Sequence, residues 1–576
     1  MNGRRALALF AAIFVAYAFF FIPNAGSNIA ARLAMVYSIV DHGTLNIDNY
    51  FQQTHDRSYY EGHWYSDKAP GSSFIGVPVY LVTSAVTRLL GLSPDKETFR
   101  YLIRVLTLSL LSALMCLALV RLCAEMTGDD RAARLAAATY ALATPALIYS
   151  VAYYSHQFAA LFLFFGFYFL WRAKQGEGNL VWVGALLAGQ AMFFEYPAGM
   201  GAGWLFLYLL TFRRDWKSIA AFIVLAFVVP IGMHAAYNTA VFGGPASLGY
   251  SNLSYDVYQE EMSRGFMGIY LPRLSALWEI TFSVHRGLFF YSPVLLIGLL
   301  GLWHFRSRAL RWEGLLLAAM IGGFLLFNAA YFEPDGGSCF GPRHIVPMLP
   351  FMIPPLAMLL ARAGSALRDV VFFLIVLSLA IATVAIFTYP LPNTVIGNPL
   401  YEAMLPLLAD GYFVDTLPGW LGLGSTGQAI VYGLILLAAF VPALTGAEKP
   451  ARSGRWAHAV SIAAILFLGW VYALSLPHAS RSGPGMVPQA LGYEAAMRHD
   501  YPRAAHDFEQ ALLARPEDPH LHYYLGDAYL KMNRPVDALV HLRRVLSLAP
   551  DYPQAESVRH AVEVLEKVAP PNPYQE

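Results

Sequence analysis

An acid and a base stand side by side as Asp67-Lys68 in the segment GHWYSDKAPGSSF (residues 62–74), where polar sequence gives way to a long apolar tract. A carboxylate can take a proton from a hydroxyl group and an ammonium can stabilise an anion, so the pair offers both halves of an acid–base reaction. Pro70 and Gly71 fix a turn directly after it. The alternative is an interface pair, with Lys68 reaching toward lipid headgroups.

Two more acids precede this pair in the same polar segment. Asp48 lies in LNIDNY and is as typical of an ordinary turn as of a site. Asp41 lies in VDHG, where capping of a helix end is the simpler use.

Other polar residues stand at the predicted ends of apolar helices. Glu195, in FFEYPAG, follows an apolar run, where an ionisable group is costly and therefore indicates a site. His156, in YYSHQF, is placed in the same way and fits a site or an interface equally. Arg286 in HRG and Arg343 in GPR each lie beside a glycine at a helix mouth, which favours an anionic partner such as a lipid phosphate over unspecific headgroup binding.

The composition places the chain among membrane proteins. Of its 576 residues 57% are hydrophobic and 13% are charged, against about a quarter charged in soluble domains. A net charge of +1 argues against nucleic acid as a partner. The three cysteines indicate no disulfide framework, and the scattered histidines show no metal-ligand spacing.

Apolar stretches of near-spanning length recur along the chain. We expect helices near 6–22, 102–121, 132–150, 157–172, 179–195, 198–212, 218–240, 287–304, 314–331, 345–361, 369–388, 428–445 and 456–476. The first is read as an uncleaved helix rather than a signal peptide, because many spans follow it. This gives about thirteen spans.

Basic residues cluster in alternate short connections, which places those connections in the cytoplasm. All of these connections can lie in the cytoplasm only if segment 74–91 does not cross the membrane. We therefore expect this segment to form an interfacial or re-entrant helix broken at Pro78. The loops 23–73, 241–286, 332–344 and 389–427, and everything after residue 477, then lie outside the cytoplasm. Long polar loops gathered on one face predict that the working face is there.

The C-terminal part is soluble in composition and repeats with a period of 34 residues. Leu491-Gly492 recurs as Leu525-Gly526, Ala504 as Ala538, and Pro516 as Pro550. The two segments resemble tetratricopeptide repeats, in which small residues let paired helices approach. We expect a membrane domain over 1–476, a linker over 477–486, a helical repeat domain over 487–570 that docks a protein partner, and a tail over 571–576.

The membrane domain resembles the GT-C fold membrane glycosyltransferases, which include the protein O-mannosyltransferases and the lipid A aminoarabinose transferases. The residues that carry the resemblance are YSDKAPG, which looks like the acid–Lys-Pro-Pro motif of those families, together with HGTLNIDNY, YYSHQF, FEYPAG, YNTAVFGGPASLGY, HRGLFFYSPVLL and GGSCFGPRH. Where those families place an acid shortly before an arginine, this chain has Asn28 before Arg32. The expected fold class is therefore all-α, a polytopic GT-C-type domain followed by a helical solenoid.

The resemblance implies an integral-membrane glycosyltransferase of a bacterial inner membrane, with its catalytic loops and repeats in the periplasm. The donor would be a sugar on a polyprenyl phosphate and the acceptor a glycan, lipid or protein. Asp67, Asp48 or Asp41 would be the base, since the acid expected near Asn28 is absent. The remaining roles are the donor phosphate for Lys68, Arg286 and Arg343, and the acceptor pocket for Glu195, His156, Asn28 and Tyr65. The resemblance makes no cofactor certain and leaves a divalent cation possible.

The sequence leaves two other functions open. A non-enzymatic transporter, flippase or assembly factor for lipid-linked glycans is expected to carry charges at mid-membrane and paired broken helices. The polar residues cluster at one face instead, which favours an enzyme. A polysaccharide polymerase or ligase would share the same face and the same kind of donor.

Overall fold

The chain folds almost entirely into helices. The structure, a computed structural model, describes residues 3–22, 26–253, 260–262, 268–444, 483–552 and 554–568. It divides into two units, one of residues 1–391 with 411–472 and the other of residues 392–410 with 473–576. The expected span at 456–476, linker residues 477–482 and the tail at 571–576 lie outside the described residues.

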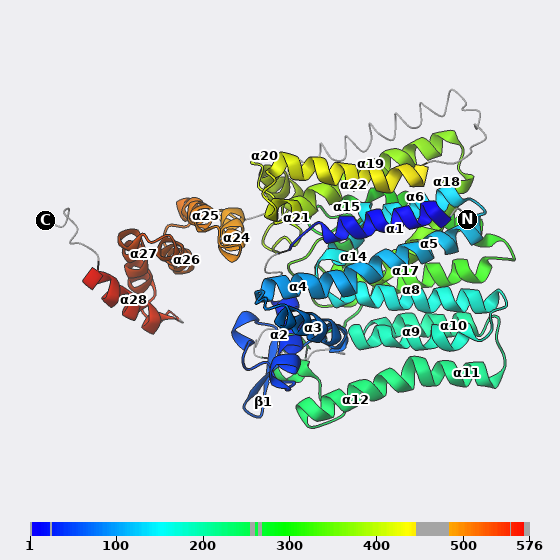
Figure 1. Cartoon of the computed structure of the whole chain (residues 1–576), viewed down its shortest axis with the longest axis horizontal. Helices are drawn as coiled ribbons and strands as arrows, with labels where there is room; N and C mark the ends of the chain where they lie inside the picture. Colours follow the sequence, from blue (N-terminus) through cyan, green and yellow to red (C-terminus); the bar gives the residue numbers. More distant parts are fainter. Residues whose placement is uncertain are drawn as a thin grey trace. The chain divides into compact units, whose positions relative to one another are not determined.

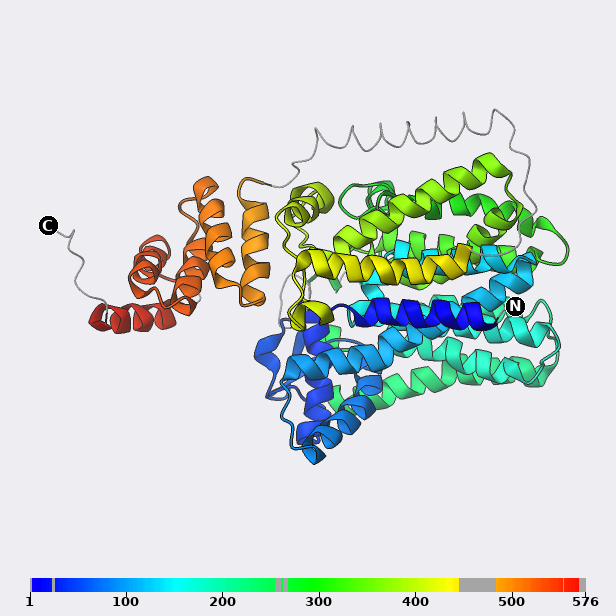
Figure 2. The same cartoon turned by 45° about the horizontal axis from the view of Figure 1, so that its top comes forward.

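The first unit is a bundle of long apolar helices that run side by side, seen in both views (Figures 1 and 2). Seven helices in the described part are long and apolar enough to cross a membrane: Gly71–Leu89, Lys96–Thr127, Trp216–Phe242, Arg311–Ala330, Arg343–Arg362, Ser365–Phe387 and Ser425–Leu444. The prediction of a polytopic, helical membrane domain is confirmed in kind. The count of about thirteen spans stays a prediction.

The elements of this unit follow in chain order. They are α1 (Gly3–Ala18), α2 (Gly26–His42), η1 (Phe51–Gln53), β1 (Arg57–Tyr60), β2 (His63–Ser66), α3 (Gly71–Leu89), α4 (Lys96–Arg104), η2 (Val105–Ser109), α5 (Leu110–Thr127), α6 (Asp130–Ala143), α7 (Ala146–Val151), α8 (Ser155–Lys174), α9 (Leu180–Phe194), α10 (Ala198–Leu209), α11 (Trp216–Ile223), η3 (Val224–Val228), α12 (Val229–Phe242), η4 (Gly249–Asn252), α14 (Leu274–Thr281), α15 (Leu288–Tyr291), α16 (Pro293–Gly298), η5 (Leu299–Arg306), α17 (Arg311–Ala330), η6 (Arg343–Met352), α18 (Ile353–Arg362), α19 (Ser365–Phe387), α21 (Leu417–Trp420) and α22 (Ser425–Leu444).

Two predicted helices are divided in the structure. The stretch 132–150 forms α6 and α7, because Pro145 cannot continue the helix and Thr144 is extended before it. The stretch 287–304 forms α15, α16 and η5, with a break at Ser292-Pro293 for the same reason. In the other direction, α4, η2 and α5 join into one helical segment that is longer than the predicted 102–121.

Helix α3 differs from its predicted form. It runs without a break from Gly71 to Leu89 through Pro78, and it is itself long and apolar enough to cross a membrane. A proline removes one N–H from the helix, and the other bonds hold the helix together here. Figure 1 shows α2 and α3 turned steeply away from the direction of the long helices. The interfacial position of the segment 74–91, now part of α3, stays a prediction.

The polar segment 23–73 has more regular structure than the expected loop. It contains the helix α2 and an antiparallel hairpin that pairs Arg57 with Ser66 and Tyr60 with His63. The two turn residues, Glu61 and Gly62, both have positive φ, of 48° and 89°, as a two-residue hairpin turn of the I′ type requires. This small sheet is the one departure from the all-α prediction in the described chain.

The second unit holds the helical repeats. Its elements are η7 (Leu400–Met404), α20 (Leu405–Ala409), α24 (Met486–Met497), α25 (Tyr501–Ala514), α26 (Pro519–Lys531), α27 (Pro535–Leu548) and α28 (Ala555–Val568). The backbone conformation repeats with the same 34-residue period. His499 and Asn533, just after the ends of equivalent helices, have similar positive φ angles of 61° and 56°. Phe508, Leu525 and Leu542 belong to the buried core of the repeats.

The paired helices of the repeats approach each other closely at Gly492 and Gly526. A Cβ at Gly526 would lie 2.9 Å from Leu542 Cδ2, and one at Gly492 would lie 2.8 Å from the Phe508 ring. We expect Gly526→Val to lower the free energy of opening of α26 and α27 by about 1–3 kcal/mol, because the added methyls overpack this contact. Hydrogen exchange of peptides from the full-length protein measures it. Asp527→Val, exposed on the same helix, is the control, and equal exchange in both variants would contradict the close approach.

Candidate active site

A polar cavity of about 400 Å³ lies in the first unit, among α2, the hairpin, the turn before α3, α8, α9 and the segment before η6. This is large enough for a sugar and a phosphate group. Its lining has four basic residues, Arg32, Arg57, Lys68 and Arg343, and four acidic ones, Asp56, Asp67, Glu195 and Glu333. Because the two signs balance, an anion would bind here through placed contacts rather than through a net positive field.

The cavity gathers six of the ten residues singled out from the sequence. They are Asp67, Lys68, Arg343, Glu195, His156 and Asn28. The other four, Asp41, Asp48, Arg286 and Tyr65, do not line it. The cavity is also lined by Asp56, Arg32 and His344, which were given no role from the sequence.

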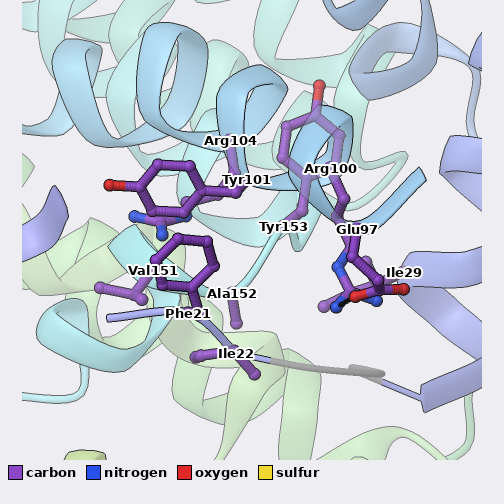
Figure 3. Close-up of a pocket in the computed structure, with 10 residues that line it drawn as sticks. All are labelled: Phe21, Ile22, Ile29, Glu97, Arg100, Tyr101, Arg104, Val151, Ala152 and Tyr153. Carbon is purple, nitrogen blue, oxygen red and sulfur yellow. Dashed lines mark ion pairs between the residues drawn. The ribbon is translucent and has the colours of Figure 1, made fainter. Parts of the chain in front are cut away.

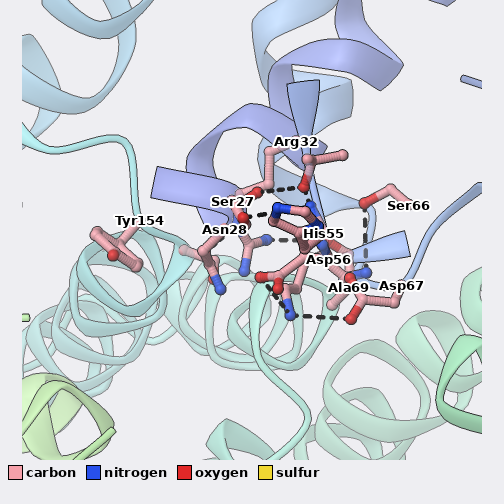
Figure 4. A network of polar contacts seen from close by, with 12 residues as sticks. Ser27, Asn28, Arg32, His55, Asp56, Ser66, Asp67, Ala69 and Tyr154 are labelled. Carbon is pink, nitrogen blue, oxygen red and sulfur yellow. Dashed lines mark hydrogen bonds and ion pairs between the residues drawn. The ribbon is translucent and has the colours of Figure 1, made fainter. Parts of the chain in front are cut away.

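Lys68 is held between two carboxylates. Its Nζ lies 2.9 Å from Asp56 Oδ2 and 3.0 Å from Asp67 Oδ2. Figure 4 shows Asp56 and Asp67 within one network of polar contacts. The Asp67 side chain is only 5% exposed and the Asp56 side chain is 30% exposed. The second Asp67 oxygen, Oδ1, is buried and has no hydrogen-bond partner among the described residues.

This arrangement shifts the pKa values of Asp67 and Asp56 in opposite directions. The pKa of Asp67 is raised to about 6, chiefly by burial and also by neighbouring Asp56, against the lowering effect of Lys68. Burial also acts on Asp56, but Lys68 outweighs it and holds its pKa below the usual range. Burial alone would lower the pKa of Lys68, yet Asp56 and Asp67 raise it above its ordinary value. Asp67 is therefore the carboxyl group that can exchange a proton near neutral pH.

Arg32 fixes the turn that carries this pair. Its Nη1 donates to Ala69 O at 3.3 Å and to Ser72 Oγ at 2.9 Å, and its Nε donates to Asn28 Oδ1 at 3.1 Å. Gly71 lets α3 begin against the end of α9, because a Cβ there would lie 2.6 Å from Phe193 O. Close packing at the start of α3 thus explains why a glycine, Gly71, follows shortly after Asp67-Lys68.

Glu195 begins a chain of polar contacts on another wall of the cavity. Its Oε1 accepts from Ser155 Oγ, lies 3.5 Å from Arg32 Nη2 and lies 3.5 Å from His156 Nδ1. His156 Nε2 lies 3.3 Å from His344 Nδ1. The extended backbone at Glu195, directly after α9, points the carboxylate toward α2 and α8 instead of along the helix.

Arg343 stands at the start of η6. Its guanidinium lies over the ring of Tyr154, 5.8 Å from the centroid, and its buried Nε has no hydrogen-bond partner among the described residues. The preceding glycines, Gly336 and Gly337, have φ of 76° and 74°, a conformation that side chains rarely adopt. This loop geometry gives Arg343 its place, because a Cβ at Gly336 would lie 2.9 Å from Arg343 Cγ.

Asp41 belongs to a structural cluster outside the cavity. Its Oδ2 accepts from Lys96 Nζ at 2.6 Å and from Tyr50 Oη at 2.9 Å, and Tyr80 Oη donates to its Oδ1 at 3.1 Å. The Lys96 ammonium also lies 4.3 Å from the centre of the Tyr37 ring. These contacts join α2, α3 and α4, so the role of base predicted for Asp41 has no support in the geometry.

We expect Asp41→Asn to destabilise the protein without removing its activity per folded molecule. The change replaces charge-assisted hydrogen bonds that join three helices, which predicts a loss of about 1–3 kcal/mol in the free energy of unfolding. Thermal melting of the purified protein, followed by intrinsic fluorescence, measures the loss. Activity that falls as far in this variant as in a variant of Asp67 would return Asp41 to the site.

The remaining three predicted residues also have local contacts. Asp48 Oδ1 accepts from Trp64 N at 2.7 Å and Oδ2 lies 2.6 Å from His63 Nδ1, so Asp48 braces the hairpin. Tyr65 packs against the Phe242 ring, 5.7 Å between centroids. Arg286 is fully buried and donates from Nη2 to Gly337 O at 3.1 Å, on the same loop that carries Arg343. Arg286 supports this loop from behind.

A second, much smaller cavity of about 20 Å³ lies beside Phe21, Tyr101 and Tyr153 (Figure 3). Two arginines, Arg100 and Arg104, stand at its edge. It has room for about one water molecule, not for a sugar or a phosphate. Arg104 donates to Tyr17 O at 2.6 Å, which caps the end of α1, so this site is structural.

No group of three or more His, Cys, Asp and Glu side chains in the described part of the chain could hold a metal ion. The divalent cation left open by the sequence therefore stays a prediction.

The comparisons with known proteins identify one part of the chain by family. Residues 495–561 match the tetratricopeptide repeat family. No curated protein sequence matches the chain. Two solved structures are similar to it. One is the Archaeoglobus fulgidus oligosaccharyltransferase in its apo form, 11% identical, with a TM-score of 0.39 over 80% of this chain and 56% of that one. The other is ArnT from Cupriavidus metallidurans bound to undecaprenyl phosphate, 14% identical, with a TM-score of 0.39 over 75% of this chain and 76% of that one.

The C-terminal repeats are thus identified as tetratricopeptide repeats. The chain spans 56% of the length of the oligosaccharyltransferase. At a TM-score of 0.39 neither solved structure assigns a residue or a substrate to this chain.

Proposed function

We propose that the membrane domain is a glycosyltransferase that moves a sugar from a polyprenyl-phosphate donor to an acceptor hydroxyl outside the cytoplasm. The observation that carries the proposal is the Asp56–Lys68–Asp67 cluster in a cavity that also holds Arg343. One such cavity supplies both a proton acceptor and cations for a leaving phosphate.

The reaction divides among these groups. The acceptor hydroxyl loses its proton to the Asp67 carboxylate while its oxygen bonds to the anomeric carbon of the donor sugar. The bond from that carbon to the phosphate oxygen breaks, and its electron pair leaves with the polyprenyl phosphate. Lys68 and Arg343 stabilise the negative charge that develops on this phosphate. The products are a glycoside and a polyprenyl phosphate.

Asp56 has a different part. Its pKa is lowered, so it is a weaker base than Asp67, and it keeps Lys68 charged and in place. Asp67 has a raised pKa of about 6, which is near neutral pH, so its carboxylate accepts a proton more readily than that of Asp56.

The prenyl chain requires an apolar surface next to the phosphate. Helix α3 starts three residues after Lys68, and Leu81, Val82, Val86 and Leu89 are exposed along it. These side chains form the surface against which membrane lipids and the prenyl chain would lie. The donor phosphate would then enter the cavity from the start of α3.

The location follows from the pattern of basic connections. We place the chain in a bacterial inner membrane, with the cavity and the tetratricopeptide repeats on the periplasmic side. The repeats carry no reactive cluster of their own in the described chain, so we assign them to docking of a protein partner. The alternative function is a non-enzymatic transporter of lipid-linked glycans. Such a transporter breaks no glycosidic bond and so does not need Asp67 as a base.

Mass spectrometry of envelope glycans, glycolipids and glycoproteins tests the proposal in cells that lack the gene. We expect one sugar modification to be lost, and to return with the parent gene but not with Asp67→Asn. A transporter would instead leave Asp67→Asn able to restore the modification.

A further inference from the structure

The Asp56–Lys68–Asp67 cluster is negative as a whole, although a lysine lies at its centre. Lys68 Nζ is 2.9 Å from Asp56 Oδ2 and 3.0 Å from Asp67 Oδ2, so one ammonium faces two carboxylates. With both carboxyl groups ionised, the one positive and two negative charges of the cluster sum to −1. An ammonium has three N–H donors, and two of them face the carboxylates, which leaves one for a ligand.

Both carboxyl groups of the cluster are ionised somewhat above neutral pH. Burial raises the pKa of Asp56, but Lys68 outweighs burial and holds this pKa below its usual range. The pKa of Asp67 is raised to about 6, chiefly by burial. Arg343 lines the same cavity and its charge acts on Asp56. Because this guanidinium offsets the excess negative charge, the cluster and Arg343 together are close to neutral.

The donor and the product of the proposed reaction differ in phosphate charge. In the donor, the phosphate is esterified to both the prenyl chain and the sugar, so it carries one negative charge. In the released polyprenyl phosphate it is esterified once, and it carries about two negative charges above its second pKa of about 6. A nearly neutral set of charges gives the second negative charge no net attraction. The cavity is therefore better matched to the donor than to the product.

We propose that Asp56 makes the cavity selective for phosphate charge, so that it favours the singly charged phosphodiester donor and disfavours the doubly charged monoester product. This inference rests on the proposed function and deepens it. Asp56 lines the cavity and is the more exposed of the two carboxylates, 30% against 5% for Asp67. Its repulsion of a phosphate grows in proportion to the charge of that phosphate.

The proton that is moved in the reaction gives this repulsion its timing. During transfer, the Asp67 carboxylate takes the acceptor proton while the phosphate gains its second negative charge, so the total charge of the site does not change. Asp67 then releases the proton to water, and the cluster returns to a charge of −1 beside a doubly charged phosphate. The repulsion promotes release of the polyprenyl phosphate and prepares the site for the next donor.

Two ligands that differ in phosphate charge test this inference. They are undecaprenyl phosphate, which is a monoester, and its methyl ester, which is a phosphodiester with one negative charge. Quenching of intrinsic fluorescence measures their binding to the full-length protein in lipid nanodiscs at about pH 8, where the monoester is doubly charged. We expect the parent to bind the monoester no more tightly than the methyl ester. Cations without opposing carboxylates would instead prefer the monoester.

Asp56→Asn should strengthen binding of the methyl ester by about threefold and of undecaprenyl phosphate by about tenfold, because the removed repulsion is twice as large for the doubly charged ligand. The amide keeps the shape of the side chain. Glu61→Gln is the matched control, since Glu61 is an exposed carboxylate in the turn of the same hairpin and does not line the cavity. Both affinities should stay at the parent value in this control.

The ratio of the first-turnover rate to the steady-state rate of sugar transfer gives a second readout. It should rise in Asp56→Asn, because the product stays bound for longer, and an unchanged ratio would contradict the release step. Equal changes of the two affinities in Asp56→Asn would mean that Asp56 only positions Lys68. That result, or tighter binding of the monoester than of the methyl ester by the parent, would overturn this inference alone. A parent that binds neither ligand would overturn the proposed function itself.

Discussion

Asp67→Asn should lower the rate of sugar transfer by about 10²-fold or more in a single turnover, because it removes the group that takes the acceptor proton. The amide has the same shape, so the Lys68 environment should change little. Asp67 Oδ2 contributes one of the two carboxylate contacts of Lys68, and Asp56 retains the other. Binding of undecaprenyl phosphate should therefore survive, and it should strengthen slightly as one nearby negative charge is lost.

The pH dependence of transfer gives this prediction a second readout. The raised pKa of Asp67, about 6, means that its carboxyl group is protonated below that pH and cannot accept the acceptor proton. The parent rate should fall as pH decreases through about 6 and reach a plateau above it. In Asp67→Asn this step should be absent from the residual rate. An unchanged pH profile in the variant would remove Asp67 from the role of base and leave Asp56 as the candidate.

Lys68→Met should weaken binding of undecaprenyl phosphate by about 10- to 100-fold, because a charge-assisted contact to the phosphate is lost. The loss is increased because Asp56 and Asp67 then face the phosphate without the ammonium between them. Transfer should recover in part at high donor concentration. Quenching of intrinsic fluorescence in nanodiscs measures the affinity.

Arg88→Met is the matched control for this experiment. Arg88 is an exposed cation in the last turn of α3 and does not line the cavity. Its loss removes a positive charge from the same helix region without touching the site. If both variants bind equally, the phosphate is held by unspecific headgroup attraction and Lys68 is an interface anchor.

The sequence was informative where function leaves a local pattern. Asp67 and Lys68 are adjacent and stand before a Pro-Gly turn, and Arg343 follows a glycine-rich segment, so each could be found by reading along the chain. The repeats were found because Gly492 and Gly526 recur at one period, and the structure shows both at close helix contacts. Apolar stretches similarly predicted most of the long helices.

The features of the site that could not be predicted from the sequence depend on contacts between residues that are distant in the chain. Asp56 has no motif of its own, and its importance comes from the 2.9 Å contact with Lys68 that the hairpin creates. His344 meets His156 from 188 positions away in the chain. Asp41 seemed available for chemistry because nothing in its neighbourhood predicts that Lys96, on another helix, occupies it. No local pattern reports such pairings.

The proposed function requires this cavity to transfer a sugar from a polyprenyl phosphate. The most direct measurement incubates the purified full-length protein with polyprenyl-phosphate sugars labelled in the sugar, together with membranes of cells that lack the gene, and follows the label. We predict that the label moves from the donor lipid to an envelope acceptor, and that polyprenyl phosphate is released in equal amount. Label that stays on the donor lipid with the parent protein, while undecaprenyl phosphate binds at Lys68, would contradict transfer and support a transporter.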